Sequence, residues 1–183
     1  NDIKEAIKDT ELIIIATTAK YVRSICVAMN PISKNIPVCI ASKGVENETC
    51  SFLSDIVFDI LKSKNIGVIS GPTFAIDLIS EEPCALSLAI SSKKTEKIVK
   101  KALANPLLKL RINHDLNGTE ICGSIKNVIA IAAGILEGLG YHESTRYFLI
   151  TEAIHDIKEL LKKGLTDKID DREVYMKGID NSY

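Results

Sequence analysis

Three segments of the chain carry residues that could bind an anion and move a proton. The first, residues 41–46, reads Ala-Ser-Lys-Gly-Val-Glu and places Lys43 directly after an apolar run. The second, residues 69–75, reads Ile-Ser-Gly-Pro-Thr-Phe-Ala, and the third, residues 119–142, holds Lys126 in a long apolar stretch. A lysine after a buried strand can contact an anion or a developing oxyanion. A lysine surrounded by apolar residues can have a lowered pKa and accept a proton from a hydroxyl.

Lys126 is the candidate base. A buried helical stripe is predicted by the spacing of Ile121, Ile125, Val128, Ala132 and Ile135. Lys126 falls on the adjoining face, among side chains that cannot pair with a charge, so its pKa is expected to fall. The alternative is a lysine whose stem packs while its ammonium group reaches water.

The segment 69–75 is a candidate ligand-binding turn. Pro72 suits the first turn of a helix, and Gly71 would let a ligand approach the backbone closely. The next free amides and the Thr73 hydroxyl would face a phosphate or a cofactor amide over the helix N-terminus. The alternative for this segment is an ordinary strand–turn–helix junction without a ligand. The alternative for Ser-Lys-Gly in the first segment is an ordinary polar turn at the end of a strand.

The elements that must position these residues alternate along the chain. Apolar runs predict buried strands at 11–17, 36–41, 66–69, 84–91 and 108–113, and helical periodicity predicts helices at 2–9, 21–29, 51–63, 73–80 and 93–105. This alternation predicts an α/β fold with a doubly wound parallel sheet, whose ligands bind at the carboxyl ends of the strands. Two long helices, 119–139 and 144–163, then replace the strand pattern, so a domain boundary is expected near residue 118.

Composition narrows the class of protein. The chain has 183 residues, 46% of them hydrophobic and 26% charged, with a net charge of −1. A charge so close to zero argues against nucleic acid or an anionic membrane as the main partner. The run 12–16 is too short to span a bilayer. Five cysteines without a C-x-x-C pair indicate reduced thiols in the cytoplasm, and three histidines without a ligand motif argue against a metal site.

A family resemblance follows from the order and spacing of three segments. Residues 41–46, 69–75 and 123–130 (Gly-Ser-Ile-Lys-Asn-Val-Ile-Ala) are similar to signature segments of the NAD(P)-dependent glycerol-3-phosphate dehydrogenases, most closely those of the bacterial type. The resemblance implies hydride transfer between C2 of sn-glycerol 3-phosphate and C4 of a nicotinamide, giving dihydroxyacetone phosphate and supplying glycerophospholipid precursors. It also implies a cytoplasmic protein with a small-molecule substrate, without membrane insertion, and either a homodimer or a chain that needs a complementary fragment.

The resemblance also implies a division of the chain and a set of site residues. Residues 1–117 would be the remainder of a Rossmann-like dinucleotide-binding domain, and 118–183 the beginning of a helical substrate domain. Lys126 would accept the proton of the C2 hydroxyl. The positions that match substrate contacts are Lys43, Gly71, Thr73, Lys126 and Asn127, and those that match contacts to NAD or NADP are Lys43 and Ala75.

The chain also departs from the family pattern. It contains no glycine-rich G-x-G-x-x-G turn, and Glu152 stands where relatives carry an arginine. Residues 141–144 replace a turn that bears glycine and asparagine, and 170–173 lack the pattern around the substrate-gripping residues. The chain is therefore expected to be part of a longer protein. Two alternatives stay open: a catalytically inactive remnant or split-gene fragment, and a related two-domain dehydrogenase acting on a hydroxy acid.

Overall fold

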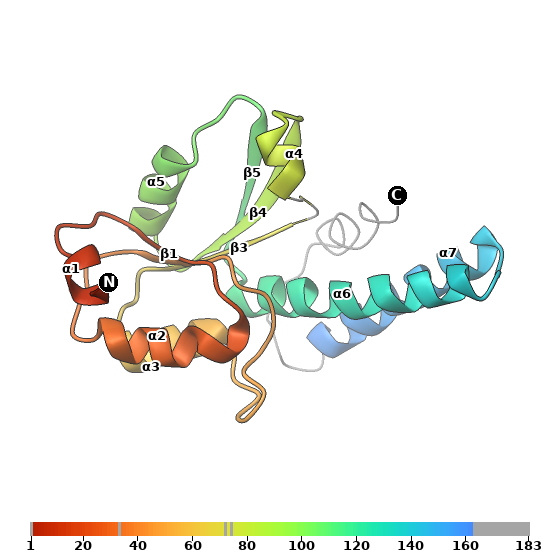
Figure 1. Ribbon diagram of the computed structural model, residues 1–183, viewed down its shortest axis with the longest axis horizontal. Helices are drawn as coiled ribbons and strands as arrows, with labels where there is room; N and C mark the ends of the chain where they lie inside the picture. The colour runs from red at the N-terminus through yellow and green to blue at the C-terminus, as the bar shows by residue number, and fades with distance from the viewer. Residues whose placement is uncertain (1, 33, 72, 74, 163–183) are drawn as a thin grey trace.

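The computed structural model describes residues 2–32, 34–71, 73 and 75–162, and these form one sheet, flanking helices and a projecting helical pair (Figure 1). The strands are β1 (Ile13–Ile15), β2 (Val38–Ile40), β3 (Ile66–Ser70), β4 (Cys84–Ile90) and β5 (Leu108–Asn113). The helices are α1 (Ile3–Ala6), the 3-10 turn η1 (Ala19–Tyr21), α2 (Val22–Met29), α3 (Leu53–Leu61), α4 (Ala75–Ile79), α5 (Lys93–Ala102), α6 (Leu116–Gly138) and α7 (Glu143–Leu160).

The sheet has its strands in the order β1-β2-β3-β4-β5, which confirms the predicted α/β, Rossmann-like fold class. One pairing differs from the expected parallel arrangement, because β3 and β4 are antiparallel while the other neighbours are parallel. In the described part of the connection between them there is one helix, the five-residue α4. At about 1.5 Å per residue, that helix is too short to return the chain to the starting edge of the sheet, so β4 runs back antiparallel to β3.

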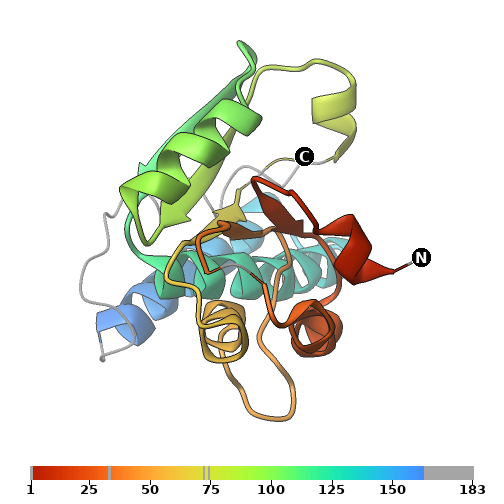
Figure 2. The ribbon, with the colours of Figure 1, turned by 90° about the vertical axis from the view of Figure 1, so that its left-hand side faces the viewer.

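Alternation along the strands builds a core on each face of the sheet. On β2, Val38 and Ile40 join the cluster that contains buried residues of α2 and α3, while Cys39 joins a second cluster with Val99 of α5. Figure 2 shows the corresponding layers, with α2 and α3 on one face and α5 on the other. Successive side chains of a strand point to opposite faces, so a continuous apolar strand is the pattern that a sheet covered on both sides requires.

Helix α6 connects the sheet to the projecting pair. Asp115 caps it by accepting a hydrogen bond from the backbone N–H of Gly118, and its first turns pack against β3, β4 and α3. Its second half extends beyond the sheet and, among the described residues, packs against α7, which contributes Ile150, Ile154 and Ile157 to their shared cluster (Figure 1).

The buried stripe predicted for α6 is only partly correct. Ile121 is buried and Ile125 is half-buried, whereas Val128 and Ile135 are 66% and 57% exposed. The reason is that the enclosed first half buries residues on all sides, while within the described parts of residues 2–162 the projecting half has α7 on one side and no element on the other. Periodicity identifies an apolar face, but it cannot show where along a helix the neighbouring elements end.

Helix α6 is also, among the described residues, the one helix that is long and apolar enough to cross a membrane. Its mean hydropathy is 1.4 over the most apolar window. A helix that carries an apolar surface inside a folded protein has the same length and composition, and the first half of α6 lies against the sheet.

Candidate functional site

Lys126 lies where α6 passes the end of β3. Its ammonium Nζ donates to the carbonyl oxygen of Gly71 at 3.5 Å, and the side chain is half-buried. Burial lowers the pKa of Lys126 below its ordinary value, and the charge and hydrogen-bonding of Lys43 lower it further. The direction is the one expected from the sequence, but a second lysine is an additional cause. A lowered pKa increases the fraction of neutral amine available to accept a proton.

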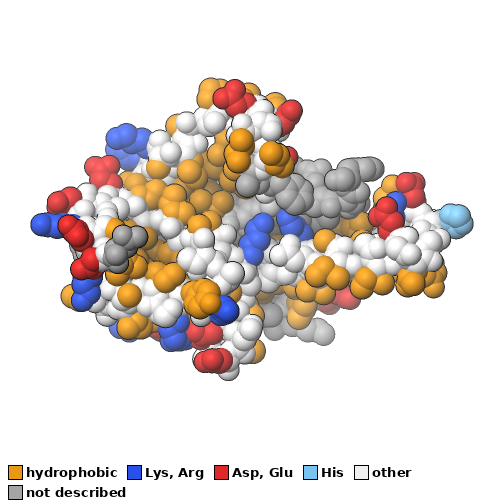
Figure 3. Space-filling model, viewed as in Figure 1, with side chains coloured by type: hydrophobic (Ala, Val, Ile, Leu, Met, Phe, Trp, Pro, Cys, Tyr) orange, Lys and Arg blue, Asp and Glu red, His pale blue; other side chains and the backbone are white. Residues whose placement is uncertain are grey.

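Lys43, β3 and α6 meet at a glycine. A Cβ placed on Gly123 would lie 2.8 Å from the Oγ of Ser70 and 3.9 Å from the Cγ of Lys43. The absence of a side chain at this position therefore lets α6 approach the end of β3 and the loop after β2 closely. The structure thus brings Lys43, Gly71 and Lys126 together from three separate parts of the sequence. Basic side chains gather in the middle of one face, where α6 leaves the sheet (Figure 3).

Replacing Gly123 with alanine is expected to lower the free energy of unfolding by about 1–3 kcal/mol, because Ser70 and α6 must move apart. Gly134 offers a matched control on the same helix, since nothing lies within 4 Å of a Cβ built there. Gly134→Ala should instead raise the free energy of unfolding by up to ~1 kcal/mol through helix propensity. Urea denaturation of both variants checks this difference, and equal effects would contradict the close approach at Gly123.

The loop that carries Lys43 is fixed to α2 by an ion pair. Arg23 donates from Nε to Glu46 Oε1 at 2.6 Å and from Nη2 to Oε2 at 2.7 Å. Thr49 also donates its hydroxyl to Glu46 Oε2, at 2.5 Å. The hydrogen bonds from Arg23 and Thr49 lower the pKa of Glu46 to about 2. Bidentate pairing restricts the geometry of both groups, so this loop has a defined path next to the sheet.

The remaining predicted contact residues lie around the same strand end. Thr73 is half-buried and donates its hydroxyl to the carbonyl of Ala85 at 3.0 Å, so that proton is already used within the protein. Asn127 is exposed next to Lys126, and Ala75 is the first residue of α4. The intervening Pro72 and Phe74 of the predicted turn lie outside the described residues, as do 170–173.

The close packing of Gly71 against β4 leaves little room for a side chain, which could not be predicted from the sequence. A Cβ at this position would lie 3.1 Å from Leu86 Cδ2 and 3.2 Å from the backbone oxygen of Ala85. An approach to β4 is therefore enough to require a glycine here, and the contact of Gly71 with a ligand stays a prediction. Its carbonyl oxygen faces Lys126, as described above.

Two buried polar residues were missed by the sequence analysis. The backbone N–H of Ser54 donates to Glu120 Oε1 at 3.1 Å, and the Ser54 hydroxyl donates to Glu120 Oε2. Burial raises the pKa of Glu120 to about 7, although the hydrogen bonds from Ser54 oppose the shift. A glutamate within the same apolar stretch as Lys126 was a signal that could have identified this pair, since carboxylates are seldom buried without a specific partner.

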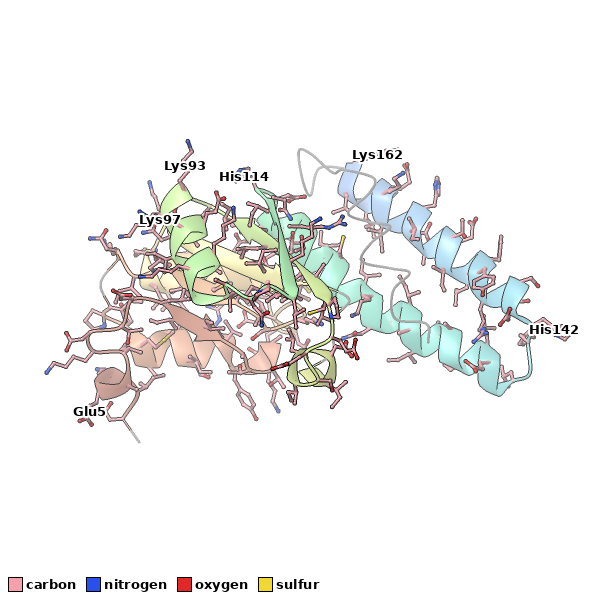
Figure 4. All side chains as sticks on the ribbon, turned by 90° about the horizontal axis from the view of Figure 1, so that it is seen from above. Glu5, Lys93, Lys97, His114, His142 and Lys162 are labelled. Carbon is pink, nitrogen blue, oxygen red and sulfur yellow. The ribbon has the colours of Figure 1, made fainter. Side chains whose placement is uncertain are left out.

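Other polar residues lie away from this site. In Figure 4, His142 lies at the tip between α6 and α7, and Lys93 and Lys97 lie on α5, on the far side of the sheet from the projecting pair. Glu152 is exposed on α7. None of these four residues takes part in the arrangement around Lys126.

The arrangement as a whole defines a class of protein. A Rossmann-like sheet is typical of dinucleotide-binding proteins, and such sheets bind their ligands at the carboxyl ends of the strands, where the half-buried Lys126 lies. Residues 1–96 match the family model for the N-terminus of NAD-dependent glycerol-3-phosphate dehydrogenase, and residues 115–174 match the model for its C-terminus. The chain belongs to the NAD-dependent glycerol-3-phosphate dehydrogenase family.

Individual relatives agree with this assignment. The chain is 40% identical over 131 residues to glycerol-3-phosphate dehydrogenase [NAD(P)+] of Solidesulfovibrio magneticus, covering 70% of this chain and 40% of that protein. It is 34% identical over 160 residues to the Thermoanaerobacter protein of the same name, covering 87% of this chain and 48% of the relative. The crystal structure of glycerol-3-phosphate dehydrogenase from Coxiella burnetii aligns with a TM-score of 0.88 and 26% identity, over 98% of this chain and 55% of that one. The chain spans about half the length of the relatives it matches.

Proposed function

We propose that this chain carries the proton-transfer centre of an NAD- or NADP-dependent sn-glycerol-3-phosphate dehydrogenase. The observation that carries the proposal is the position of Lys126, half-buried beside Lys43 and facing the backbone of Gly71 at the end of β3. The names of its relatives supply the substrate and cofactor class. We also propose that the chain is divided into two domains, residues 1–117 and 118–183. This boundary falls in the first turn of α6, where the sheet ends and the helical pair begins.

Lys126 would act on the proton of the C2 hydroxyl. As the neutral amine it accepts that proton during oxidation of sn-glycerol 3-phosphate, and as the ammonium it returns a proton during reduction of dihydroxyacetone phosphate. Lys43 has two effects in this proposal. Its charge favours the neutral form of Lys126, and it attracts the anionic substrate to the same place.

The chain's own residues also suit a nicotinamide cofactor. Strands β1, β2 and β3 are parallel, so their carboxyl ends lie at one edge, and Lys43 and Ala75 follow two of these ends. We infer contacts to the cofactor from Lys43 and Ala75. The nicotinamide, when bound, would supply or accept the hydride. Contacts to the substrate are inferred for Lys43, Gly71, Thr73, Lys126 and Asn127.

We further propose a cytoplasmic enzyme that supplies glycerophospholipid precursors, acting as a homodimer or together with a complementary chain. The names of the relatives support the reaction on glycerol 3-phosphate, and the exposed apolar side chains of α6, including Val128 and Ile135, support contact with further protein.

The direct test is an activity assay of the protein purified in the form that the cell makes. The assay follows the absorbance of added NADH or NADPH. Dihydroxyacetone phosphate should be reduced, and dihydroxyacetone, which lacks the phosphate, should be a much poorer substrate because Lys43 would have no anion to attract. A folded protein that oxidises neither cofactor with the phosphate ester contradicts the proposal and favours an inactive remnant. Equal rates with both ketones would contradict the role assigned to Lys43.

A further inference from the structure

Glu120 is a buried carboxyl group that the proposed chemistry does not use. It lies on α6, six residues before Lys126, and only 4% of the residue is exposed. Both of its oxygens accept hydrogen bonds from Ser54, one from the backbone N–H and one from the hydroxyl, and Ser54 is itself 3% exposed. The pair therefore joins α6 to the first turn of α3 inside the protein.

The helix to which Glu120 is joined directly follows the loop that carries Lys43. Helix α3 begins at Leu53, and the backbone of the loop is tied to itself by hydrogen bonds from Glu46 N to Ser51 O and from Cys50 N to Glu46 O. The beginning of the loop is fixed through Glu46 to Arg23 of α2. The end of the loop is fixed to α6 by Glu120, so the two lysines belong to elements that this carboxylate connects.

Glu120 also accepts a hydrogen bond from the backbone at the start of α3, which the residue before this helix does not do. Phe52, the residue before α3, provides no side-chain hydrogen bond to the first turn. The first backbone N–H groups of a helix have no partner within the helix, and a carboxylate at that end is favoured by the helix dipole. Glu120 supplies this carboxylate from another helix, so its contribution is to the relative placement of α3 and α6.

We propose that Glu120 is a positioning residue, which holds α6 against the Lys43 loop so that Lys126 stays next to Lys43 and Gly71. This inference rests on the proposed function of Lys126 for its catalytic meaning, but the placement itself can be measured without turnover. Burying a carboxyl group is costly, and an apolar side chain of similar volume would fill the same space without that cost. Retaining a carboxyl group here is consistent with a geometric role.

The test is the titration of the Lys126 side chain, followed by NMR of lysine-labelled protein with the signal assigned through Lys126→Arg. Glu120→Gln retains the volume but leaves one Ser54 donor without an acceptor, and Ser54→Ala removes the hydroxyl while leaving Glu120 in place. Both variants should raise the pKa of Lys126 by half a unit or more, because Lys126 moves away from Lys43 and toward water. Loss of the Glu120 charge alone would shift the pKa in the opposite direction, since a nearby anion favours the ammonium form.

Ser92→Ala is the matched control, because Ser92 caps α5 by accepting from Thr95 N, away from this site. It should leave the Lys126 titration unchanged. In turnover, Glu120→Gln and Ser54→Ala should lower kcat about tenfold with little change in KM for the cofactor. If both variants fold and the pKa of Lys126 is the same as in the wild type, the positioning role of Glu120 is overturned. If Glu120→Gln does not fold, the Lys126 pKa in Ser54→Ala alone tests this role. A wild type without turnover would refute the proposed function, while the titration would still decide the role of Glu120.

Discussion

Replacing Lys126 with alanine is expected to lower kcat for reduction of dihydroxyacetone phosphate by about 10²–10⁴-fold, the usual contribution of a positioned acid or base. The reason is that Lys126 Nζ is the group at the end of β3 whose environment lowers its pKa, through burial and through Lys43. Without it, the alkoxide formed at C2 during reduction loses the proton donor that the proposal assigns to it. Steady-state rates measured from the absorbance of the reduced cofactor check the prediction.

Two further variants separate proton transfer from charge. Lys126→Arg keeps a cation in place but cannot give up its proton at accessible pH, so it should be nearly as inactive as Lys126→Ala. Lys97→Ala removes a lysine from α5, on the far side of the sheet, and should leave the rate unchanged (Figure 4). An active Lys126→Arg variant would assign Lys126 to anion binding alone.

The second large effect is a dependence of stability on pH that comes from Glu120. The pKa of Glu120 is raised from 4.5 to about 7 by burial, so the folded protein binds this proton more tightly than the unfolded chain does. Stability from this group is therefore greatest below pH ~4.5 and is lost as the pH rises to ~7. The loss amounts to about 3 kcal/mol of unfolding free energy.

Glu120→Gln cannot titrate and is the reference for this effect. The free energy of unfolding should be measured by urea denaturation at intervals of pH for both proteins, and the wild-type value should fall relative to that of the variant between pH ~4.5 and ~7. The lowered pKa of Glu46 acts below this window and is common to both proteins, so it cancels in the difference. Parallel curves for the two proteins would show that Glu120 has an ordinary pKa in the folded state.

Local patterns in the sequence predicted most of the secondary structure. The apolar runs at 36–41 and 84–91 lie on β2 and β4, because a strand buried on both faces needs apolar residues at every position. The antiparallel pairing of β3 with β4 could not be predicted in this way. It depends on the length of α4, which is shorter than the predicted helix at 73–80.

Residues of the candidate site could be identified from the sequence when a short segment shows them, and were missed when their contacts lie far apart in the sequence. Lys126 was identified because a charge in an apolar helix is visible in a short window of sequence. The hydrogen bonds of Glu120 go to Ser54, 66 residues earlier, and no pattern within one helix reveals them. The ligand contact of Gly71 stays a prediction, and its contact with β4 could not be predicted because it depends on strand pairing.

The most direct test of this account is the titration of the Lys126 ammonium group in the wild-type protein by NMR, with and without Lys43→Ala. The account predicts a midpoint below the ordinary lysine value of 10.5, and a rise toward that value when Lys43 is replaced. A midpoint at or above 10.5, unaffected by Lys43, would contradict the claim that these two lysines form a proton-transfer site.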